Sequence, residues 1–235
     1  MDTRPGVPSV RDRLGLSADT LDLLERLEER YAEAVAFGFL GPREAERLRE
    51  RHLDDALGLA LHRRPKPGTR WADLGSGAGL PGLPLAAAFP ETSFTLVDSH
   101  KRRLTWVAST AEALGITNVA VVHERLEAFG RSPDRERFDV AVARALGQPP
   151  VVLELGLPLI RKGGLLMVPR GQVSDGERAL LTRVAKQLGG GAPKVVHNAA
   201  SPVDRPGAVI MMTKVATTSR RFPRQPGQPE RQPLS

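Results

Sequence analysis

The segment from Trp71 to Gly82, WADLGSGAGLPG, constrains the fold of this chain more than any other feature. Its apolar start is typical of a buried strand, and Gly75, Gly77 and Gly79 follow at alternate positions. Glycine tolerates the positive φ of a tight turn and lets a ligand approach the backbone closely. Pro81 lacks a backbone N–H and suits the first turn of a helix. The segment therefore predicts a strand, a glycine turn and a helix start that together bind a nucleotide-like cofactor.

An acidic residue follows where a carboxylate can bind ribose. The apolar run 94–98 ends in Asp98, and the carboxyl end of the next parallel strand lies beside the glycine turn. A dinucleotide fingerprint, G-x-G-x-x-G, would place its third glycine at Leu80, whereas this chain reads D-x-G-x-G-x-G from Asp73. That spacing resembles the first motif of class I S-adenosylmethionine-dependent methyltransferases, in which a helix N-terminus serves the methionine carboxylate. A glycine turn without a ligand is the alternative, and Asp98 argues against it.

Residues 69–216 alternate between strand and helix patterns, which predicts a mostly parallel sheet with helices on both faces. The predicted strands are 70–74, 93–97, 118–122, 138–143, 164–169, 193–198 and 208–215. The predicted helices are 82–88, 101–114, 149–160 and 175–188. Gly163-Gly164 should form a turn before the fifth strand, and the last two strands should be antiparallel. The fold class is therefore α/β: the seven-stranded, Rossmann-like class I methyltransferase fold.

The two ends of the chain differ from this core. Residues 1–68 predict a helical extension, with a loose arm over 1–16 and a helix capped by Ser17. A second amphipathic helix restarts at Pro42 and ends near Leu61. Residues 217–235 contain four prolines among arginines and glutamines, with no core-facing period. We expect them to form a flexible basic tail whose removal leaves the fold and the cofactor site in place.

Composition narrows the classes of function. The absence of cysteine excludes disulfides and a cysteine nucleophile, and fits a reducing compartment. There is no apolar run of about 18 residues and no signal-peptide core, so we expect a cytoplasmic protein without a membrane segment. The net charge of +7 combines 12 basic and 13 acidic side chains in residues 1–68, 18 and 13 in residues 69–216, and four and one in 217–235, so the basic excess lies in residues 69–235. This excess favours a polyanionic substrate such as RNA, although an arginine-rich genome would produce the same bias.

The histidines give no sign of a metal site. They are scattered along the chain, with no i,i+4 pair and no carboxylate cluster at ligand spacing: His52, His62, His100, His123 and His197. His52 lies on an amphipathic helix face, where packing is the more common role and a substrate contact the alternative. No metal is therefore expected.

The fourth predicted strand is where a base-methylating enzyme would reveal its target. It lacks the Asn or Asp, two prolines and aromatic residue of exocyclic amine methyltransferases, because Gln148-Pro149-Pro150 is followed by Val151 and not by a stacking ring. Arg144 remains at the strand end, where its planar guanidinium can stack on a base or contact a phosphate. Pairing with a carboxylate is the alternative role. Guanine N7 already presents a lone pair, so its methylation needs alignment and exclusion of water but no general base.

Several segments, taken in order, resemble one family. They are Arg51-His52-Leu53-Asp54, the glycine segment with its continuation Leu80-Pro81-Gly82-Leu83-Pro84, Asp98-Ser99, Phe138-Asp139 and Ala143-Arg144-Ala145. Over about residues 20–232 the chain resembles the bacterial glucose-inhibited division protein B family, small-subunit ribosomal RNA guanine-N7 methyltransferases. It departs from the family pattern at Gly38-Phe39-Leu40, where many members carry Asn-Leu-Thr, and at Arg170-Gly171, where many carry Lys-Gly.

The resemblance implies the functional residues. The glycines would contact the methionine part of S-adenosylmethionine, Asp98 the ribose, and Leu126-Glu127 the adenine. The full set of implied cofactor residues is Asp73, Gly75, Gly77, Gly79, Leu80, Asp98, Leu126, Glu127 and Arg144. Arg144 would also be the catalytic residue, and Arg170, Arg221 and Arg224 would bind RNA.

The expected activity is thus S-adenosylmethionine-dependent methyl transfer to guanine N7 in 16S ribosomal RNA, with ribosomal RNA or the small ribosomal subunit as partner. A small-molecule methyltransferase and a cofactor-binding RNA protein without turnover are the alternatives. The sequence leaves open the exact nucleotide, whether the substrate is naked RNA or an assembled subunit, and the oligomeric state, for which a monomer is expected.

Overall fold

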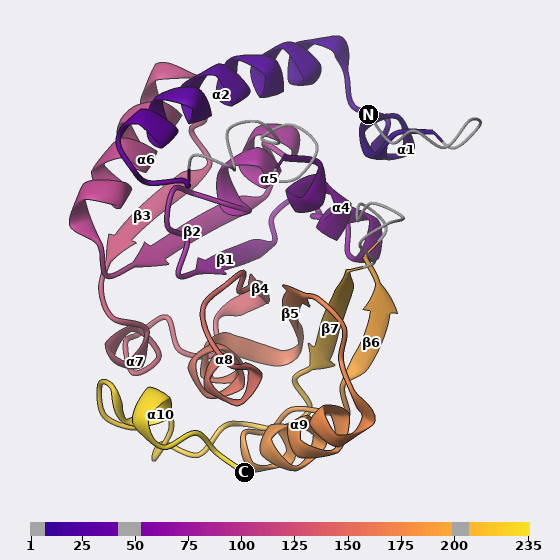
Figure 1. Cartoon of the computed structure of the whole chain (residues 1–235), viewed down its shortest axis with the longest axis vertical. Coiled ribbons are helices and arrows are strands. Elements are labelled where there is room, and N and C mark those ends of the chain that lie inside the picture. The colour runs from indigo at the N-terminus through magenta and orange to yellow at the C-terminus, as the bar shows by residue number, and fades with distance from the viewer. Residues whose placement is uncertain (1–7, 42–52, 199–206) are drawn as a thin grey trace.

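The core of the protein is a seven-stranded sheet with strand order β3-β2-β1-β4-β5-β7-β6, seen in a computed structural model that describes residues 8–41, 53–198 and 207–235 (Figure 1). The strands are β1 (Arg70–Leu74), β2 (Ser93–Asp98), β3 (Val119–His123), β4 (Phe138–Val142), β5 (Ile160–Arg170), β6 (Lys194–His197) and β7 (Ala208–Thr213). Strands β1 to β5 pair in parallel, and β7 is antiparallel to both β5 and β6. The predicted α/β class and the antiparallel final pair are confirmed. The strand order reverses between β1 and β4, which is where sheets of this type bind ligands.

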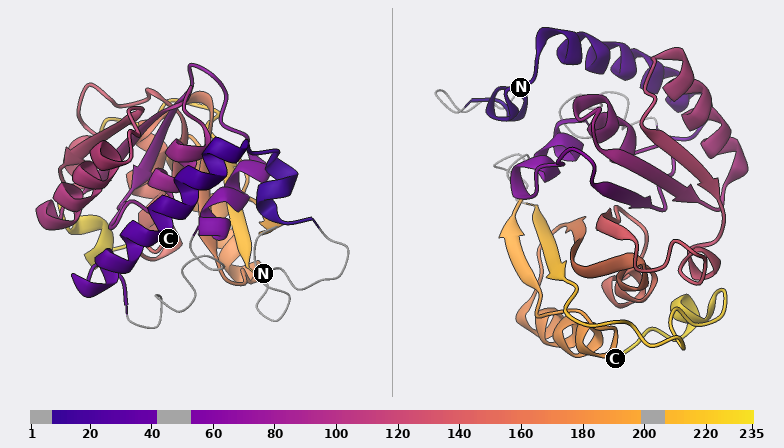
Figure 2. Two further views of the ribbon diagram at one scale, coloured as in Figure 1. Left: turned by 90° about the horizontal axis from the view of Figure 1, so that it is seen from above. Right: turned by 180° about the vertical axis from the view of Figure 1, so that it is seen from behind.

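Helices cover both faces of the sheet (Figures 1 and 2). One face carries α1 (Val10–Leu14), α2 (Ala18–Ala36), α4 (Asp54–His62), α5 (Gly82–Ala88) and α6 (Lys101–Ala113). The other carries α7 (Leu126–Phe129), α8 (Pro149–Gly156) and α9 (Asp175–Gln187), and α10 (Gln228–Arg231) contacts α8. Along β1, Trp71 joins the core cluster of the first face, and Ala72 and Leu74 join that of the second, as the two-residue period of a strand requires.

The N-terminal helices share the core of the sheet. Ser17 caps α2 by accepting a hydrogen bond from the Thr20 N–H, and the buried face of α2 is Leu24, Leu27, Tyr31 and Ala34, as the spacing predicts. The prediction of a loose arm over residues 1–16 is wrong for residues Val10–Leu14, which form α1. A capping box between Ser9 and Asp12 starts this helix, and its buried Val10 and Leu14 pack with the core. Five residues are too few for periodicity to reveal such a helix.

The second predicted helix is only partly described. Residues 42–52, which include the expected restart at Pro42 and His52, lie outside the described residues. The remainder corresponds to α4, where Asp54 forms an ion pair with Arg11 of α1 at 2.9 Å. This contact ties the start of the chain to the helix that precedes β1.

Strand β5 begins earlier than predicted. The expected helix 149–160 ends at Gly156 and continues as a 3-10 turn over Leu157–Leu159, so that β5 starts at Ile160. Gly163 and Gly164 lie inside the strand, where the β4–β5 register shifts, and they exchange backbone hydrogen bonds with Lys214. The glycine pair is therefore an irregularity within β5, held by the chain after β7, and not a turn before the strand.

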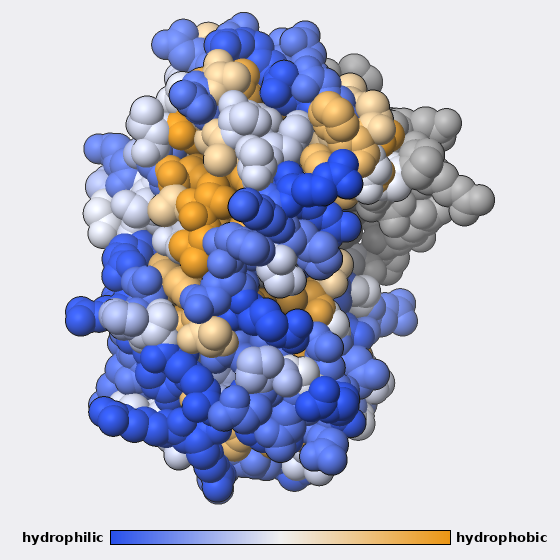
Figure 3. All heavy atoms as spheres, turned by 90° about the vertical axis from the view of Figure 1, so that its left-hand side faces the viewer, coloured by the Kyte–Doolittle hydropathy of each residue, from blue (hydrophilic) through white to orange (hydrophobic). Residues whose placement is uncertain are grey.

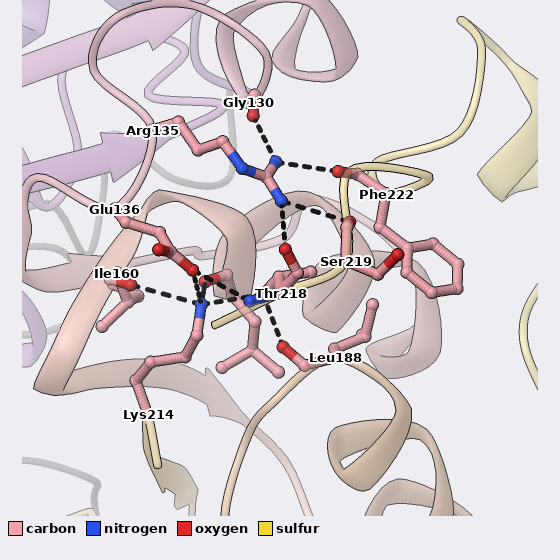
Figure 4. A network of polar contacts seen from close by, with 10 residues as sticks. Gly130, Arg135, Glu136, Ile160, Leu188, Lys214, Thr218, Ser219 and Phe222 are labelled. Carbon is pink, nitrogen blue, oxygen red and sulfur yellow. Dashed lines mark hydrogen bonds and ion pairs between the residues drawn. The ribbon is translucent and has the colours of Figure 1, made fainter. Parts of the chain in front are cut away.

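The C-terminal segment, residues 217–235, is packed and not a flexible tail. Phe222 is 3% exposed and belongs to the core cluster on the α8 side of the sheet. The Arg135 guanidinium donates hydrogen bonds to the carbonyl oxygens of Gly130, Thr218, Ser219 and Phe222 (Figure 4). The fully buried Lys214 donates to the carbonyl oxygens of Leu157 and Ile160 and to the Thr218 hydroxyl (Figure 4). The expectation of disorder fails because one aromatic residue and donors from distant parts of the chain anchor a segment of polar composition.

Candidate cofactor and substrate site

The glycine turn joins β1 to α5 at the reversal of the strand order. Gly75, Gly77 and Gly79 have φ values of +69°, +54° and +80°, a region that other residues rarely adopt. A Cβ atom on Gly75 would lie 2.5 Å from Cδ1 of Leu146, and one on Gly79 would lie 2.8 Å from the Leu83 side chain. A Cβ atom on Gly77 would meet nothing within 4 Å. Two of the glycines therefore allow close packing within the protein, and Gly77 leaves the backbone open to an approaching group.

Asp98 lies beside this turn, as the sequence predicts. Its carboxylate accepts hydrogen bonds from the backbone N–H groups of Gly77 and His100, both at 2.8 Å, and lies 2.9 Å from Nδ1 of His100. Burial alone would raise the pKa of Asp98, but the hydrogen bonds from Gly77 and His100 lower it below its usual value. Asp98 is thus an ionised acceptor at the end of β2. The sequence alone shows His100 only as one of five scattered histidines, and its position two residues after Asp98 is the signal that indicates this contact.

Asp73 is a buried carboxyl group at the end of β1. Oδ2 accepts a hydrogen bond from the Gly82 N–H at the start of α5 (2.8 Å), and Oδ1 has no hydrogen-bond partner among the described residues. Burial raises the pKa of Asp73 to about 7, against the lowering effects of the Gly82 N–H and of Arg144. Folded proteins rarely leave a buried acceptor unsatisfied, so Oδ1 is suited to a donor supplied by a ligand.

Tyr31 of α2 supports the same turn and was not predicted as a site residue. Its hydroxyl donates a hydrogen bond to the Gly79 carbonyl oxygen at 3.3 Å, and its ring centroid lies 5.5 Å from that of Trp106. Burial and the nearby Asp73 raise the pKa of Tyr31 well above its usual value, so the phenol remains a donor. The sequence shows Tyr31 only as one buried position of an amphipathic helix. The contact joins α2 to the glycine turn across 48 residues.

Leu126 and Glu127, the residues implied for adenine, form the start of α7. Leu126 is 6% exposed and belongs to the core. Oε1 of Glu127 accepts hydrogen bonds from the Arg125 guanidinium at 2.9 Å and from the Gly227 N–H at 2.7 Å. Burial opposes ionisation of Glu127, but these two donors lower its pKa. The position of this carboxylate is therefore set by the C-terminal segment, which no local pattern indicates.

A hollow of about 410 Å³ opens at the carboxyl ends of β4 and β5, next to the glycine turn. Its lining combines apolar groups with backbone and a few polar side chains: Ala143, Ala145, Leu146, Gly147, Gln148, Pro149, Val152, Val168, Pro169 and Arg170. Half-buried Arg144 follows β4, and its charge lowers the pKa values of both Asp73 and Tyr31. Arg144 thus acts electrostatically on the glycine-turn side of the site, whereas Arg170 lines the hollow and forms an ion pair with Glu177 at 3.0 Å.

The three arginines predicted to bind RNA do not form one cluster. Arg221 is exposed, and its guanidinium carbon lies 4.7 Å from the centroid of the Phe222 ring. Arg224 instead donates hydrogen bonds through Nε and Nη2 to the buried carboxylate of Glu154. The expectation that Arg224 belongs to a flexible RNA-binding tail is wrong, because its guanidinium is an internal partner of α8. Of Arg221 and Arg224, Arg221 is the one whose side chain is exposed to solvent.

The described residues contain neither a cluster of metal ligands nor a helix suited to cross a membrane. Within residues 8–41, 53–198 and 207–235, no three His, Asp or Glu side chains gather closely enough to hold a metal ion. Over the same ranges, no helix combines the length and apolar character that crossing a bilayer requires.

The chain has relatives among known proteins. A family model described as rRNA small subunit methyltransferase G matches residues 21–202. A protein from Chloroflexus aggregans named ribosomal RNA small subunit methyltransferase G is 38% identical over 201 residues, covering 84% of this chain and 83% of the relative. A protein of the same name from Bacillus licheniformis is 35% identical over 186 residues, covering 78% and 77%.

Solved structures share the fold. A SAM-dependent O-methyltransferase from Thermotoga maritima superposes with a TM-score of 0.54 at 17% identity, over 71% of this chain and 66% of its own. A 16S rRNA (adenine(1408)-N(1))-methyltransferase from Catenulisporales acidiphilia gives 0.54 at 17% identity, over 65% and 88%. These likenesses establish the class I methyltransferase fold. Because the family model spans most of the chain and the sequence relatives exceed 30% identity over more than two thirds of it, this protein belongs to the rRNA small subunit methyltransferase G family.

Proposed function

We propose that this protein transfers the methyl group of S-adenosylmethionine to guanine N7 in the 16S RNA of the small ribosomal subunit. The observation that carries the proposal is the juxtaposition, at the reversal of the strand order, of the glycine turn, two carboxyl groups and the hollow at the ends of β4 and β5. Family membership supports the substrate class, since the matching relatives are named for small-subunit ribosomal RNA.

The residues present fit the cofactor. Gly77 leaves its backbone open, Asp98 is an ionised acceptor for ribose hydroxyls, and Oδ1 of Asp73 is a buried acceptor suited to the ammonium group of the methionine part. Leu80 follows the turn and is nearly buried, and Leu126 and Glu127 would border the adenine. When bound, the cofactor supplies a methyl group on a sulfonium, which is already activated for displacement.

The protein's own task is then alignment and exclusion of water. The glycine turn and Asp98 hold one reactant, and the hollow beside Leu146 can hold a planar base at the end of β4. Guanine N7 carries a lone pair, so no residue has to remove a proton before the transfer. Arg144 follows β4, and its charge stabilises ionised Asp73. We propose that it orients the substrate and cofactor and does not exchange protons.

The experiment that tests this function is methylation of purified substrates. Deproteinised small-subunit ribosomal RNA and intact small subunits from a strain lacking the gene are incubated with methyl-labelled S-adenosylmethionine, and labelled N7-methylguanine is mapped by chemical cleavage at that base. Label at one guanine supports the proposal and decides between naked RNA and the assembled subunit. Label on another atom, or turnover only on small molecules, would refute it. Binding of S-adenosylhomocysteine without any turnover would favour the cofactor-binding RNA protein.

A further inference from the structure

Four aromatic side chains form a continuous run from the glycine turn to the surface. The chain has only ten aromatic residues, seven Phe, two Trp and one Tyr. Centroid distances are 5.5 Å for Tyr31–Trp106, 6.4 Å for Phe39–Trp106 and 5.8 Å for Phe37–Phe39. Tyr31 is fully buried, whereas Phe37 is 57% exposed, the most exposed large apolar side chain among the described residues. The run begins at a residue that contacts the cofactor turn and ends in solvent.

Core packing accounts for the inner part of this run but not for Phe37. Burial of a phenyl group stabilises a protein by about 1.5–3 kcal/mol, and an exposed ring gains little of this. Beside Phe37 the surface is hollowed by about 320 Å³, lined by Phe37, Phe39, Arg102, Thr105 and Trp106. A shallow, open hollow with an exposed aromatic wall is suited to another planar group that stacks on that wall.

The charge around the hollow indicates the kind of planar group. The Arg102 guanidinium carbon lies 5.9 Å from the centroid of the Phe39 ring, and Arg102 is the cation that lines the hollow. The first turn of α6 carries no acidic residue. Aromatic rings interleaved with cations bind unpaired nucleotides, because the rings stack on the bases and the cations contact the phosphates. An acidic partner without planar groups would match only the cation, and a purely apolar partner would match only the rings.

The location connects this surface to the cofactor site. Helix α6 starts three residues after Asp98, and Tyr31 at the inner end of the run donates to Gly79. Figure 3 faces the side of the molecule on which α2 and α6 lie, and it shows apolar groups there set among hydrophilic side chains. An RNA chain whose target base enters the hollow at β4 and β5 can therefore extend along the same edge of the sheet.

We propose that Phe37, Phe39 and Arg102 form a stacking platform for an unpaired base of the RNA substrate, separate from the base that is methylated. The inference rests on the proposed function, to which it adds a second contact surface. The platform contributes to RNA binding and leaves the affinity for the cofactor unchanged, because the ring contacts of its three residues are with one another and with Trp106.

The test compares Phe37→Ala, Phe37→Trp and Arg102→Ala with the wild-type protein. The matched controls are Val215→Ala, which trims the other exposed large apolar side chain, and Arg183→Ala, which removes one exposed cation from α9. Two RNA probes are used: deproteinised small-subunit ribosomal RNA for kcat/KM, and a single-stranded RNA decamer containing one 2-aminopurine, whose fluorescence falls when the base stacks. Calorimetry with S-adenosylhomocysteine monitors the cofactor site.

Phe37→Ala should lower kcat/KM for ribosomal RNA about tenfold and abolish most of the fluorescence quenching, since one base–ring stack is lost. Phe37→Trp should stay within about twofold of wild type, and Arg102→Ala should also reduce the salt dependence of binding. Wild-type kcat/KM and quenching in Phe37→Ala would overturn the platform. Dissociation of a wild-type dimer by Phe37→Ala, seen by sedimentation, would overturn it too, because the surface would then be a contact between two copies. Ring-dependent quenching without any rRNA methylation would refute the proposed function and leave the platform standing.

Discussion

The two ends of the proposed cofactor site are held in place in different ways. The glycine turn is held mostly by hydrogen bonds over short sequence separations: Gly77 donates to Asp98 and Gly82 donates to Asp73, over 21 and nine residues, and Tyr31 adds one contact across 48 residues. The start of α7 is fixed by the far end of the chain, because Gly227 donates to Glu127 across 100 residues. Most hydrogen bonds at one end of the site are therefore local, whereas the other end forms only after the C-terminal segment has packed against α7.

The C-terminal segment reaches α7 through several contacts. The Arg131 guanidinium donates to the Pro223 carbonyl oxygen at 2.6 Å and 3.0 Å, and a Cβ atom on Gly130 would lie 2.7 Å from the Pro223 ring. The next residue, Arg224, donates hydrogen bonds to the Glu154 carboxylate of α8. The polar network around Arg135 and Lys214 holds the start of the segment (Figure 4). The position of Glu127 thus depends on the packing of the C-terminal segment. The hydrogen bonds that hold the glycine turn come from other parts of the chain.

The largest effect is expected for Arg224→Ala. It leaves the carboxylate of Glu154, 0% exposed, without its charged partner, and breaking a buried ion pair in this way costs about 3–5 kcal/mol. Urea denaturation should show this loss, and calorimetry should show weaker binding of S-adenosylhomocysteine, because the donor to Glu127 lies three residues further on.

The double variant Arg224→Ala/Glu154→Leu is the matched control. It removes the stranded charge as well, so it should recover most of the lost stability. A loss below about 1 kcal/mol in the single variant would show that the C-terminal segment does not hold α7, and the contrast between the two ends of the site would disappear.

The glycine-turn end of the site can be tested through the pH dependence that Asp73 gives to the unfolding free energy. Its pKa in the folded protein, about 7, lies above the value of 3.8 for the unfolded chain, so the folded state binds the proton more tightly between these pH values. Its contribution to stability is complete below about pH 4 and is lost as the pH rises through 7, on the order of 4 kcal/mol.

Asp73→Asn removes this titration. The variant should match the wild type near pH 4 and be more stable than it at pH 8, with a flatter profile of unfolding free energy against pH. A parallel pair of profiles would mean that Asp73 ionises freely in the folded protein. S-adenosylhomocysteine binding should nevertheless be weaker in the variant, because the neutral amide attracts an ammonium group less than a carboxylate does.

Substitutions of two glycines in the turn are expected to affect different quantities, the stability of the fold and the affinity for the cofactor. Gly75→Ala adds a methyl group 2.5 Å from Leu146 in a backbone conformation with φ +69°, so we expect a loss of about 1–3 kcal/mol in unfolding free energy. Gly77→Ala has a similar backbone cost but adds its methyl group to open space. It should lower the affinity for S-adenosylhomocysteine more than the stability.

Leu146→Ala in the Gly75→Ala background provides the control, since it removes the atom against which the new methyl group would press. Partial recovery of stability there, with none in Gly77→Ala/Leu146→Ala, would confirm that the two glycines have different tasks. Equal effects of all these changes on binding and on unfolding would contradict that division.

The same contrast explains which parts of the structure the sequence could predict. The alternation of strands and helices and the meeting of the glycine turn with Asp98 follow from patterns within about 30 residues, the length of one strand–helix–strand unit. Tyr31, Gly227 and the anchoring of Phe222 could not be predicted this way, because each acts across 48 residues or more and looks like an ordinary helix, loop or tail residue in its own segment. Low hydrophobicity in residues 217–235 indicates disorder, whereas the arginine donors Arg131 and Arg135 satisfy backbone carbonyls of this segment and Lys214 donates to the Thr218 hydroxyl.

The smallest effect is expected for Arg221, three residues before Arg224. Its side chain is exposed and lies over the Phe222 ring, so Arg221→Ala should change the unfolding free energy by no more than about 0.5 kcal/mol. If Arg221 contacts an RNA phosphate, the slope of log affinity for small-subunit ribosomal RNA against log salt should become shallower by about 0.7–0.9. Arg231→Ala, which removes another arginine from the same segment, provides the comparison for a general charge effect. An unchanged slope would assign Arg221 to the fold alone. A loss of stability as large as that of Arg224→Ala would show that the whole segment, and not one ion pair within it, holds the start of α7 in the proposed site.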